Sequence, residues 1–233
     1  MQTKRVDRES FLVEAVRGKR ALHIGCVDAG LLEDRLLTQT FLHTKLRGSA
    51  AELWGLDLDE EGVRRLESLG YSRLYVGSAE TPPSGLPRNY FDVIVAGEVI
   101  EHVRNAGLML DSAARLLTPV GLLVVTTPNA LRFYNPLPVL LGMELVHPDH
   151  LSWYSPHTLR KAVEASPFCV EQLFVCNGLP LASLKSARNP LRWGMRLLYN
   201  VGISVLHPVL VRLFPYFADG LVLIGRPSPK GSP

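Results

Sequence analysis

The chain has 233 residues, of which 47% are hydrophobic and 20% charged, and a formal net charge of +3. These values favour one globular domain over residues 1–233, and so small a charge neither requires nor excludes a nucleic-acid partner. Cys26, Cys169 and Cys176 are too few and too scattered for a disulfide framework, and no secretory leader or long apolar run is evident, so the cytoplasm is the expected location.

The first half of the chain alternates short apolar runs with stretches of helical periodicity. Strands are expected at residues 21–24, 53–56, 71–76, 91–96 and 122–126. Helices are expected at residues 8–17, 31–47, 60–70 and 105–117. This alternation is typical of a parallel sheet with crossover helices.

The second half is less regular. Residues 130–154 form an expected loop, after which Ser155 is a candidate N-cap for a helix over 156–165. Strands expected at 168–176 and 220–224 flank an apolar helical insertion, residues 188–214. The insertion is interpreted as a lid over the substrate pocket, a homodimer interface or a peripheral membrane contact, with lid or dimer favoured because such uses are commoner.

Two features at the ends of the first two strands predict a nucleoside-bearing cofactor. In the turn after the first strand, Gly25 permits a tight bend and Gly30 would let helix and cofactor approach without a Cβ. Asp57 ends the second strand, where a carboxylate can accept both hydroxyl hydrogens of a ribose. Asp59 is assigned to capping the helix that follows.

These residues belong to a longer series of motifs over residues 18–176, namely HIGCVDAG, GLDLDEEGV, GSAE, FDVIVAGEVIEHV and GLLVVTTPN. In this order they resemble the class I S-adenosylmethionine-dependent methyltransferases. The resemblance implies a Rossmann-like, doubly wound α/β sheet of seven strands with the last antiparallel, and a core of residues 18–176 and 219–226. It implies S-adenosylmethionine as cofactor, bound by His23, Gly25, Cys26, Gly30, Asp57, Leu58, Ala79, Glu80, Gly97 and Glu98.

The chain departs from the family pattern at two positions of the first turn. His23 stands where the family has an acid, and Val27 stands where it has a second glycine. A non-catalytic protein that binds S-adenosylmethionine is therefore an alternative to an enzyme.

Acidic and imidazole side chains at Glu98, Glu101 and His102, and again at His147 and His150, suggest a metal site. If a helix begins near Glu98, Glu98 and Glu101 share one face. The set resembles the metal site of small-RNA 3′-terminal 2′-O-methyltransferases, and the EVxEHV stretch is shared with ubiquinone-biosynthesis O-methyltransferases. The resemblance implies Glu98, Glu101, His102 and His150 as ligands for Mg²⁺ or another divalent metal. Without metal, His102, His147 or His150 is the candidate general base, or serves only the structure.

The expected activity is O-methylation of a hydroxyl on a small or medium-sized acceptor, such as a sugar, a phenol or another natural-product or cell-envelope intermediate. RNA 2′-O-methylation is the alternative within enzymes, although no basic patch supports it. An NAD-dependent oxidoreductase is disfavoured by the order of the motifs. Trp153 and Tyr154 either stack on the acceptor or lead into the next helix.

Overall fold

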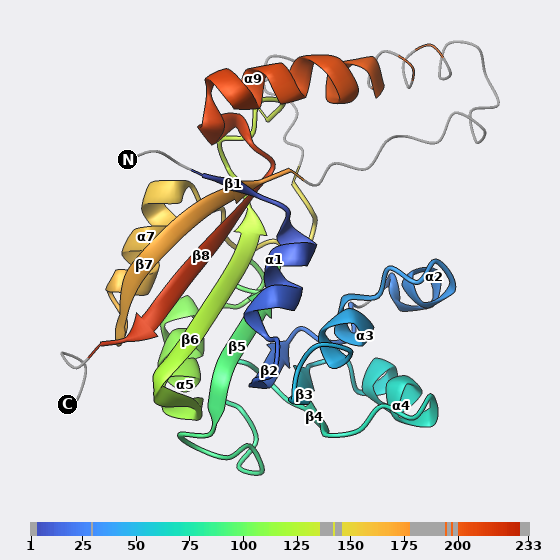
Figure 1. Ribbon diagram of the computed structural model, residues 1–233, viewed down its shortest axis with the longest axis vertical. Helices are drawn as coiled ribbons and strands as arrows, with labels where there is room; N and C mark the ends of the chain where they lie inside the picture. Colours follow the sequence, from blue (N-terminus) through green and yellow to red (C-terminus); the bar gives the residue numbers. More distant parts are fainter. Residues whose placement is uncertain are drawn as a thin grey trace.

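The computed structural model describes residues 4–28, 30–135, 142, 146–177, 194, 197 and 200–228 (Figure 1). The strands are β1 (Arg5–Val6), β2 (Arg20–Ile24), β3 (Glu52–Asp57), β4 (Leu74–Val76), β5 (Phe91–Gly97), β6 (Leu117–Pro128), β7 (Phe168–Cys176) and β8 (Gly220–Pro227). They form one eight-stranded sheet in the order β1-β7-β8-β6-β5-β2-β3-β4. Among the paired strands described, β8 is antiparallel to β6 and β7, and the other pairs are parallel.

The predicted α/β sheet with its last strand antiparallel is confirmed. The eighth strand, β1, was not expected: its two residues, Arg5 and Val6, pair with Val175 and Cys176 of β7. Two residues are too short to show a period, so only the pairing partner reveals this strand. The expected strand at 71–76 is shorter, since only residues 74–76 pair as β4.

The helices are α1 (Arg8–Ala15), α2 (Leu32–Leu37), α3 (Leu42–Arg47), α4 (Glu60–Ser68), α5 (Ala106–Leu116), α7 (Pro156–Glu164) and α9 (His207–Leu213). A π-helical turn, η1 (Gly202–Leu206), leads into α9, and a 3₁₀ turn, η2 (Pro215–Phe217), follows it. Ser155 caps α7 as predicted, accepting a hydrogen bond from the N–H of Thr158. The single helix expected over 31–47 is wrong, because Gln39 has a φ of 57° and separates α2 from α3.

Alternate residues of the central strands pack on opposite faces of the sheet. In β5, Ile94 and Ala96 join a core with α5 and α7, whereas Val93 and Val95 join a core with α1 and α3. The continuous apolar runs in the sequence therefore reflect strands that are covered on both faces. From β2 the following strands are added on one side, through β3 to β4, whereas from β5 they are added on the other side, beginning with β6. The switch in strand order therefore lies between β2 and β5, and sheets of this kind bind ligands in the crevice at the carboxyl ends of such strands.

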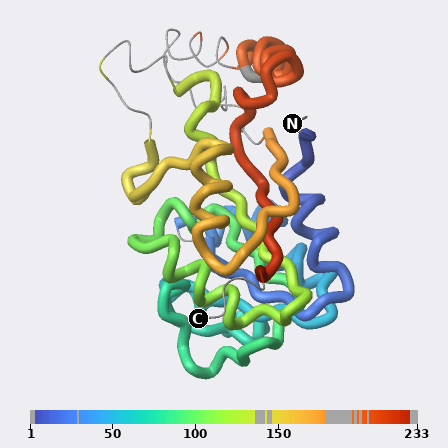
Figure 2. The backbone as a smooth tube through the Cα atoms, turned by 90° about the vertical axis from the view of Figure 1, so that its left-hand side faces the viewer, coloured from blue at the N-terminus to red at the C-terminus, as the bar shows by residue number. Residues whose placement is uncertain are grey.

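The helix α9 lies beyond the carboxyl end of β6, at one end of the molecule in both views (Figures 1 and 2). Of the predicted insertion, residues 188–214, Gly194, Leu197 and the part from Asn200 onward are described, and the remainder lies outside the described residues. Among the helices of the described ranges, none is long and apolar enough to cross a membrane.

Candidate active site

The turn after β2 is built around Gly25, whose φ of 75° is a conformation that side chains rarely adopt. A Cβ at this position would also lie 2.5 Å from Cγ2 of Val99, in the turn that follows β5. Gly25 is therefore needed where the carboxyl ends of β2 and β5 meet.

Val27 occupies the position at which the family pattern has a second glycine, and its side chain turns away from the crevice. It is fully buried in a small core with residues of α2 and α4. A Cβ on Gly62 of α4 would lie only 2.2 Å from Cγ1 of Val27. Gly62 of α4 therefore leaves the space that the Val27 side chain occupies. Val27 does not line the ligand crevice.

Asp57 ends β3 and is joined to the same turn by hydrogen bonds. Its Oδ2 accepts from the N–H of Val27 at 2.8 Å, and its Oδ1 accepts from the N–H of Asp59 at 3.0 Å. Asp59 caps α4 by accepting from the N–H of Gly62, as predicted. Since each carboxylate oxygen has two lone pairs, Asp57 can still accept hydrogen bonds from a ligand.

A cavity of about 660 Å³ lies along the carboxyl ends of β2 to β5, a size that suits a small organic ligand. The predicted cofactor-binding residues that line it are His23, Gly25, Cys26, Asp57, Leu58, Ala79, Glu80, Gly97 and Glu98. Gly30 does not line it, and apart from the adjacent residues of the chain no atom lies within 4 Å of the position that its Cβ would take. A close approach of the cofactor to Gly30 therefore stays a prediction, and the φ of 78° at Gly30 favours glycine by itself.

Glu80 braces one wall of the cavity. Its Oε1 accepts hydrogen bonds from the backbone N–H groups of Arg104 and Asn105, at 2.7 and 3.2 Å. These bonds tie the segment before α5 to the loop after β4, on which Ala79 is buried. The two loops therefore form one continuous edge of the cavity.

Arg8, on α1, lines the same cavity and was not indicated by any sequence pattern. Its Nε donates to Oγ1 of Thr126 at 3.0 Å and lies 3.4 Å from Oε1 of Glu98. Thr126 in turn donates to that Glu98 oxygen at 3.0 Å. These contacts hold Glu98, whose φ of 58° is unusual for a residue other than glycine. A lone arginine on a leading helix gives no signal in the sequence, because its partners come from β6 and from the turn after β5.

His23 faces a second buried imidazole rather than a carboxylate. Its Nδ1 lies 3.1 Å from Nδ1 of His43 on α3, so that one ring must donate to the other. Burial lowers the pKa of His43 to about 4, and burial together with the neighbouring His43 and Arg8 lowers the pKa of His23 well below its usual value. Both rings are therefore neutral at pH 7 in the folded chain.

This pair predicts a loss of stability in acid. The unfolded chain protonates His43 near pH 6.5, whereas the folded chain does so only near pH 4. The contribution of the neutral His43 to the free energy of unfolding is therefore fully present above pH 6.5 and is lost as the pH falls toward 4. Between pH 7 and pH 5, His43 alone should lower the free energy of unfolding by about 2 kcal/mol. Urea titrations at the two pH values should show a smaller loss in His43→Phe than in the parent chain.

His157→Gln, at an exposed position of α7, controls for the removal of a histidine as such. An equal pH dependence in His43→Phe and the parent chain would contradict the assignment of the acid sensitivity to the buried pair.

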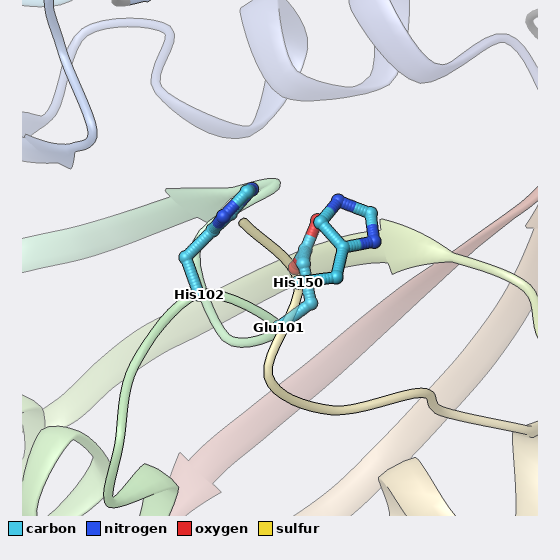
Figure 3. A group of neighbouring side chains, drawn as sticks. All are labelled: Glu101, His102 and His150. Carbon is cyan, nitrogen blue, oxygen red and sulfur yellow. The ribbon is translucent and has the colours of Figure 1, made fainter. Parts of the chain in front are cut away.

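Beside the cavity, Glu101, His102 and His150 each place a ligand atom within 4.8 Å of the others (Figure 3). Glu101 and His102 belong to the turn after β5, and His150 comes from the segment before α7. The N–H groups of Leu151 and Ser152 donate to the carbonyl oxygen of Glu101 at 2.8 and 3.2 Å. These backbone bonds bring the two segments together.

The Glu101 carboxyl group is buried, and only one of its two oxygens has a hydrogen-bond partner. Its Oε2 accepts a hydrogen bond from Oγ1 of Thr127 at 2.9 Å, while its Oε1 is buried without a hydrogen-bond partner. Burial, followed by the nearby Glu98 charge, raises the pKa of Glu101 to about 8. A buried carboxylate oxygen that lacks a partner is costly unless a proton or a cation compensates its charge.

The three candidate histidines lie close together. The ring of His150 has its centroid 4.7 Å from that of His102 and 5.3 Å from that of His147. Burial and the neighbouring His102 and His147 lower the pKa of His150 to about 4. Nδ1 of His102 lies 3.1 Å from the carbonyl oxygen of Asp149. Because a neutral imidazole is the form that binds metal, the environment of His150 suits a ligand.

No helix of the described residues begins near Glu98, so the conditional argument that placed Glu98 beside Glu101 on one helical face does not hold, and Glu98 as a metal ligand stays a prediction. Residues 98–105 form turns and bends, and α5 begins only at Ala106, so Glu98 and Glu101 do not share a helical face. The Glu98 carboxylate contacts Arg8 and Thr126 instead. Of the four residues proposed as ligands, the structure groups Glu101, His102 and His150.

Trp153 and Tyr154 take different roles. Tyr154 is part of the main core and its bridge to Asn129 leads the chain into α7. Trp153 lines a small hollow together with Glu101, Arg132 and His150. Tyr154 therefore leads into the next helix, whereas stacking of Trp153 on an acceptor stays a prediction.

Comparison with known proteins gives the family context of this arrangement. A family model described as "Methyltransferase domain" matches residues 7–173. The ubiquinone biosynthesis O-methyltransferase of Rhodopseudomonas palustris (strain BisA53) is 32% identical over 128 residues, covering 54% of this chain and 46% of that protein. The enzyme of the same name from Aeromonas salmonicida is 29% identical over 181 residues, covering 71% and 69% of the two chains.

The chain spans about half the length of several curated relatives that it matches. Among solved structures, a SAM-dependent methyltransferase from Archaeoglobus fulgidus aligns with a TM-score of 0.56 and 19% identity, covering 94% of this chain and 91% of that one. At 19% identity, this structural match supports a similarity of fold alone.

Proposed function

This chain belongs to the methyltransferase-domain family, and we propose that it transfers a methyl group from S-adenosylmethionine to a hydroxyl oxygen of a small or medium-sized acceptor. The observation that carries the proposal is the continuity of one site: the cavity that contains Asp57 reaches His102, His147 and His150. Relatives named ubiquinone biosynthesis O-methyltransferase support oxygen as the methyl acceptor.

The cavity offers chemistry that matches each part of the cofactor. Asp57 can accept hydrogen bonds from ribose hydroxyls, and exposed Leu58 with buried Ala79 offers apolar surface to the adenine. Arg8 and Glu98 present opposite charges at the other end of the cavity, which suit the carboxylate and ammonium groups of a methionine moiety. When bound, S-adenosylmethionine would supply a methyl group on a positively charged sulfur.

The residues around Glu101 fit a divalent cation. The orphaned Oε1 of Glu101 and the two imidazoles of His102 and His150 are a donor set that Zn²⁺, Mn²⁺ or another transition metal accepts. A cation there would lower the pKa of a coordinated acceptor hydroxyl and orient it. Thr127 fixes the Glu101 carboxylate by donating to Oε2, which leaves the buried Oε1 without a protein partner.

If no metal binds, the imidazoles of His102, His147 and His150 remain the groups able to take the proton of the acceptor hydroxyl. His147 is half-exposed at the cavity rim, and its Nδ1 accepts a hydrogen bond from the N–H of Asp149 at 3.3 Å. Its Nε2 then carries the proton in the neutral ring, and removal of the acceptor proton requires that bond to open.

A non-catalytic binder is the weaker interpretation. It was motivated by His23 and Val27, but Val27 packs into the core and leaves the cavity open. His23 lines the cavity as part of a neutral histidine pair, so this position lacks the negative charge of the family's acid, while Glu98 remains among the carboxylates that line the cavity. The altered turn therefore changes the charges of the site without closing it.

Calorimetric titration of the chain with S-adenosylmethionine and S-adenosylhomocysteine, each with and without Mn²⁺, tests the proposal. We expect dissociation constants of about micromolar magnitude for both compounds, as is common for cofactor sites of this size. Absence of binding under every condition would contradict the proposed function, and binding without methyl transfer to a broad panel of hydroxyl acceptors would favour the non-catalytic alternative.

A further inference from the structure

The outer face of η1, α9 and η2 carries large apolar side chains that no described part of the chain covers. They are Val205, Leu206, Val209, Leu213, Phe214 and Tyr216, each between 48% and 65% exposed. Along the helical part, Val205, Val209 and Leu213 are spaced four residues apart and so form one stripe. We call these six residues the outer apolar face.

The opposite side of α9 is anchored in the protein. His207 and Val211 are 2% exposed, and Nε2 of His207 lies 3.2 Å from Oδ1 of Asp219. The ring of Phe133 lies 5.2 Å from that of His207. The helix is thus apolar on the side that faces solvent while its inner side is already packed, the reverse of an ordinary surface helix.

The charge of this region indicates what could cover the face. Residues 172–218 contain five of the 25 lysines and arginines, at Lys185, Arg188, Arg192, Arg196 and Arg212, and none of the 22 acidic residues. The net positive charge of the chain therefore resides in this segment. A large apolar surface marks an interaction site, and Arg212, exposed on the same helix within this basic stretch of sequence, favours an anionic partner.

We propose that the outer apolar face binds the surface of a membrane that contains anionic lipids. Val205, Val209 and Leu213 would enter the boundary between head groups and acyl chains, and Arg212 would reach the lipid phosphates, the arrangement typical of interfacial helices. Tyr216 and Phe214, at the end of α9, match the preference of aromatic side chains for this depth.

The surface is connected directly to the candidate active site. Nδ2 of Asn129 donates to the carbonyl oxygens of Tyr216 and Ala218, at 2.7 and 2.8 Å, and the N–H of Phe133 donates to the carbonyl oxygen of Phe217 at 3.3 Å. Asn129 also lines the hollow beside Glu101 and His150. An acceptor carried in the bilayer would therefore enter next to these residues. This consequence rests on the proposed function, whereas membrane binding does not.

Vesicle flotation of the full chain tests the proposal. The vesicles contain either phosphatidylcholine alone or equal parts phosphatidylcholine and phosphatidylglycerol. The test variant is Val205→Glu/Val209→Glu, and the control is Val120→Glu, at a 79% exposed position near the amino end of β6. We expect the parent chain and the control to float with the anionic vesicles, and the test variant to bind them at least about tenfold more weakly.

Because the substituted positions are exposed, melting temperature and S-adenosylmethionine binding should match the parent chain in both variants. Failure of the parent chain to float with anionic vesicles would overturn the proposal, as would an equal loss in the control. A dimer that the paired substitution dissociates, without flotation of the parent chain, would assign the face to self-association and also overturn it. Failure to bind S-adenosylmethionine would contradict the proposed function alone.

Discussion

Replacing Asp57 with alanine is expected to weaken S-adenosylmethionine binding by about 100-fold or more, since two hydrogen bonds to a charged carboxylate would be lost. The carboxylate also accepts the backbone N–H groups of Val27 and Asp59. Alanine would leave the buried N–H of Val27 without a partner and lower the free energy of unfolding by about 1–3 kcal/mol. Calorimetry and urea denaturation on the same variant measure the two effects separately.

Asp57→Asn distinguishes ribose binding from support of the turn. Its amide oxygen can keep the hydrogen bond from Val27, but the amide nitrogen has no lone pair to offer a ribose hydroxyl. The amide nitrogen would also face the N–H of Asp59, a second donor, so that hydrogen bond is lost. We therefore expect both the stability and the affinity to lie between those of the parent chain and Asp57→Ala. Unchanged affinity in both variants would remove the ribose assignment.

Replacing Glu101 with glutamine is expected to weaken binding of Mn²⁺ or Zn²⁺ by about 100-fold, because it removes the only carboxylate of the grouped ligands. The fold should be retained: the buried carboxyl has a pKa of about 8, so its neutral form predominates at pH 7 without metal, and glutamine has the same shape. Glutamine can also accept the hydrogen bond from Thr127. Calorimetric titration with each cation at pH 7.5 provides the measurement.

Glu98→Gln is the matched control, because it removes a neighbouring carboxylate that contacts Arg8 and lies outside the group. Its cation affinity should fall much less than that of Glu101→Gln, since Glu98 lies outside the group and its charge acts on the cation only from a distance. Equal losses in the two variants would indicate a site shared by both carboxylates. Unchanged affinity in Glu101→Gln, or full methyl transfer in excess EDTA, would contradict the metal assignment.

Features that depend on neighbouring residues in the chain could be predicted from the sequence. The strands were recognisable because their buried runs are short and bounded by turn residues, and Asp59 and Ser155 were recognisable because a cap acts three residues away. The order of the motifs then placed Asp57 at the carboxyl end of a strand beside the first turn. Errors arose where a period was extended too far, as across Gln39 between α2 and α3.

The remaining features depend on residues far apart in the chain. Arg8 meets Glu98 and Thr126, and His23 meets His43, only after α1 and α3 have packed on one face of the sheet. The sequence around these residues does not indicate either contact, since hydrogen bonds between distant segments impose no spacing on the sequence.

The doubly wound sheet, the turn at Gly25 and the position of Asp57 follow from local sequence, because hydrophobic period, capping and glycine conformation act over a few residues. That Glu101 rather than Glu98 groups with His102 and His150 follows from the folded arrangement, since backbone hydrogen bonds from Leu151 and Ser152 hold the two segments together. The folded arrangement also decides which side of α9 remains uncovered. Both outcomes depend on which distant surfaces pack together, and packing is a property of the folded chain as a whole.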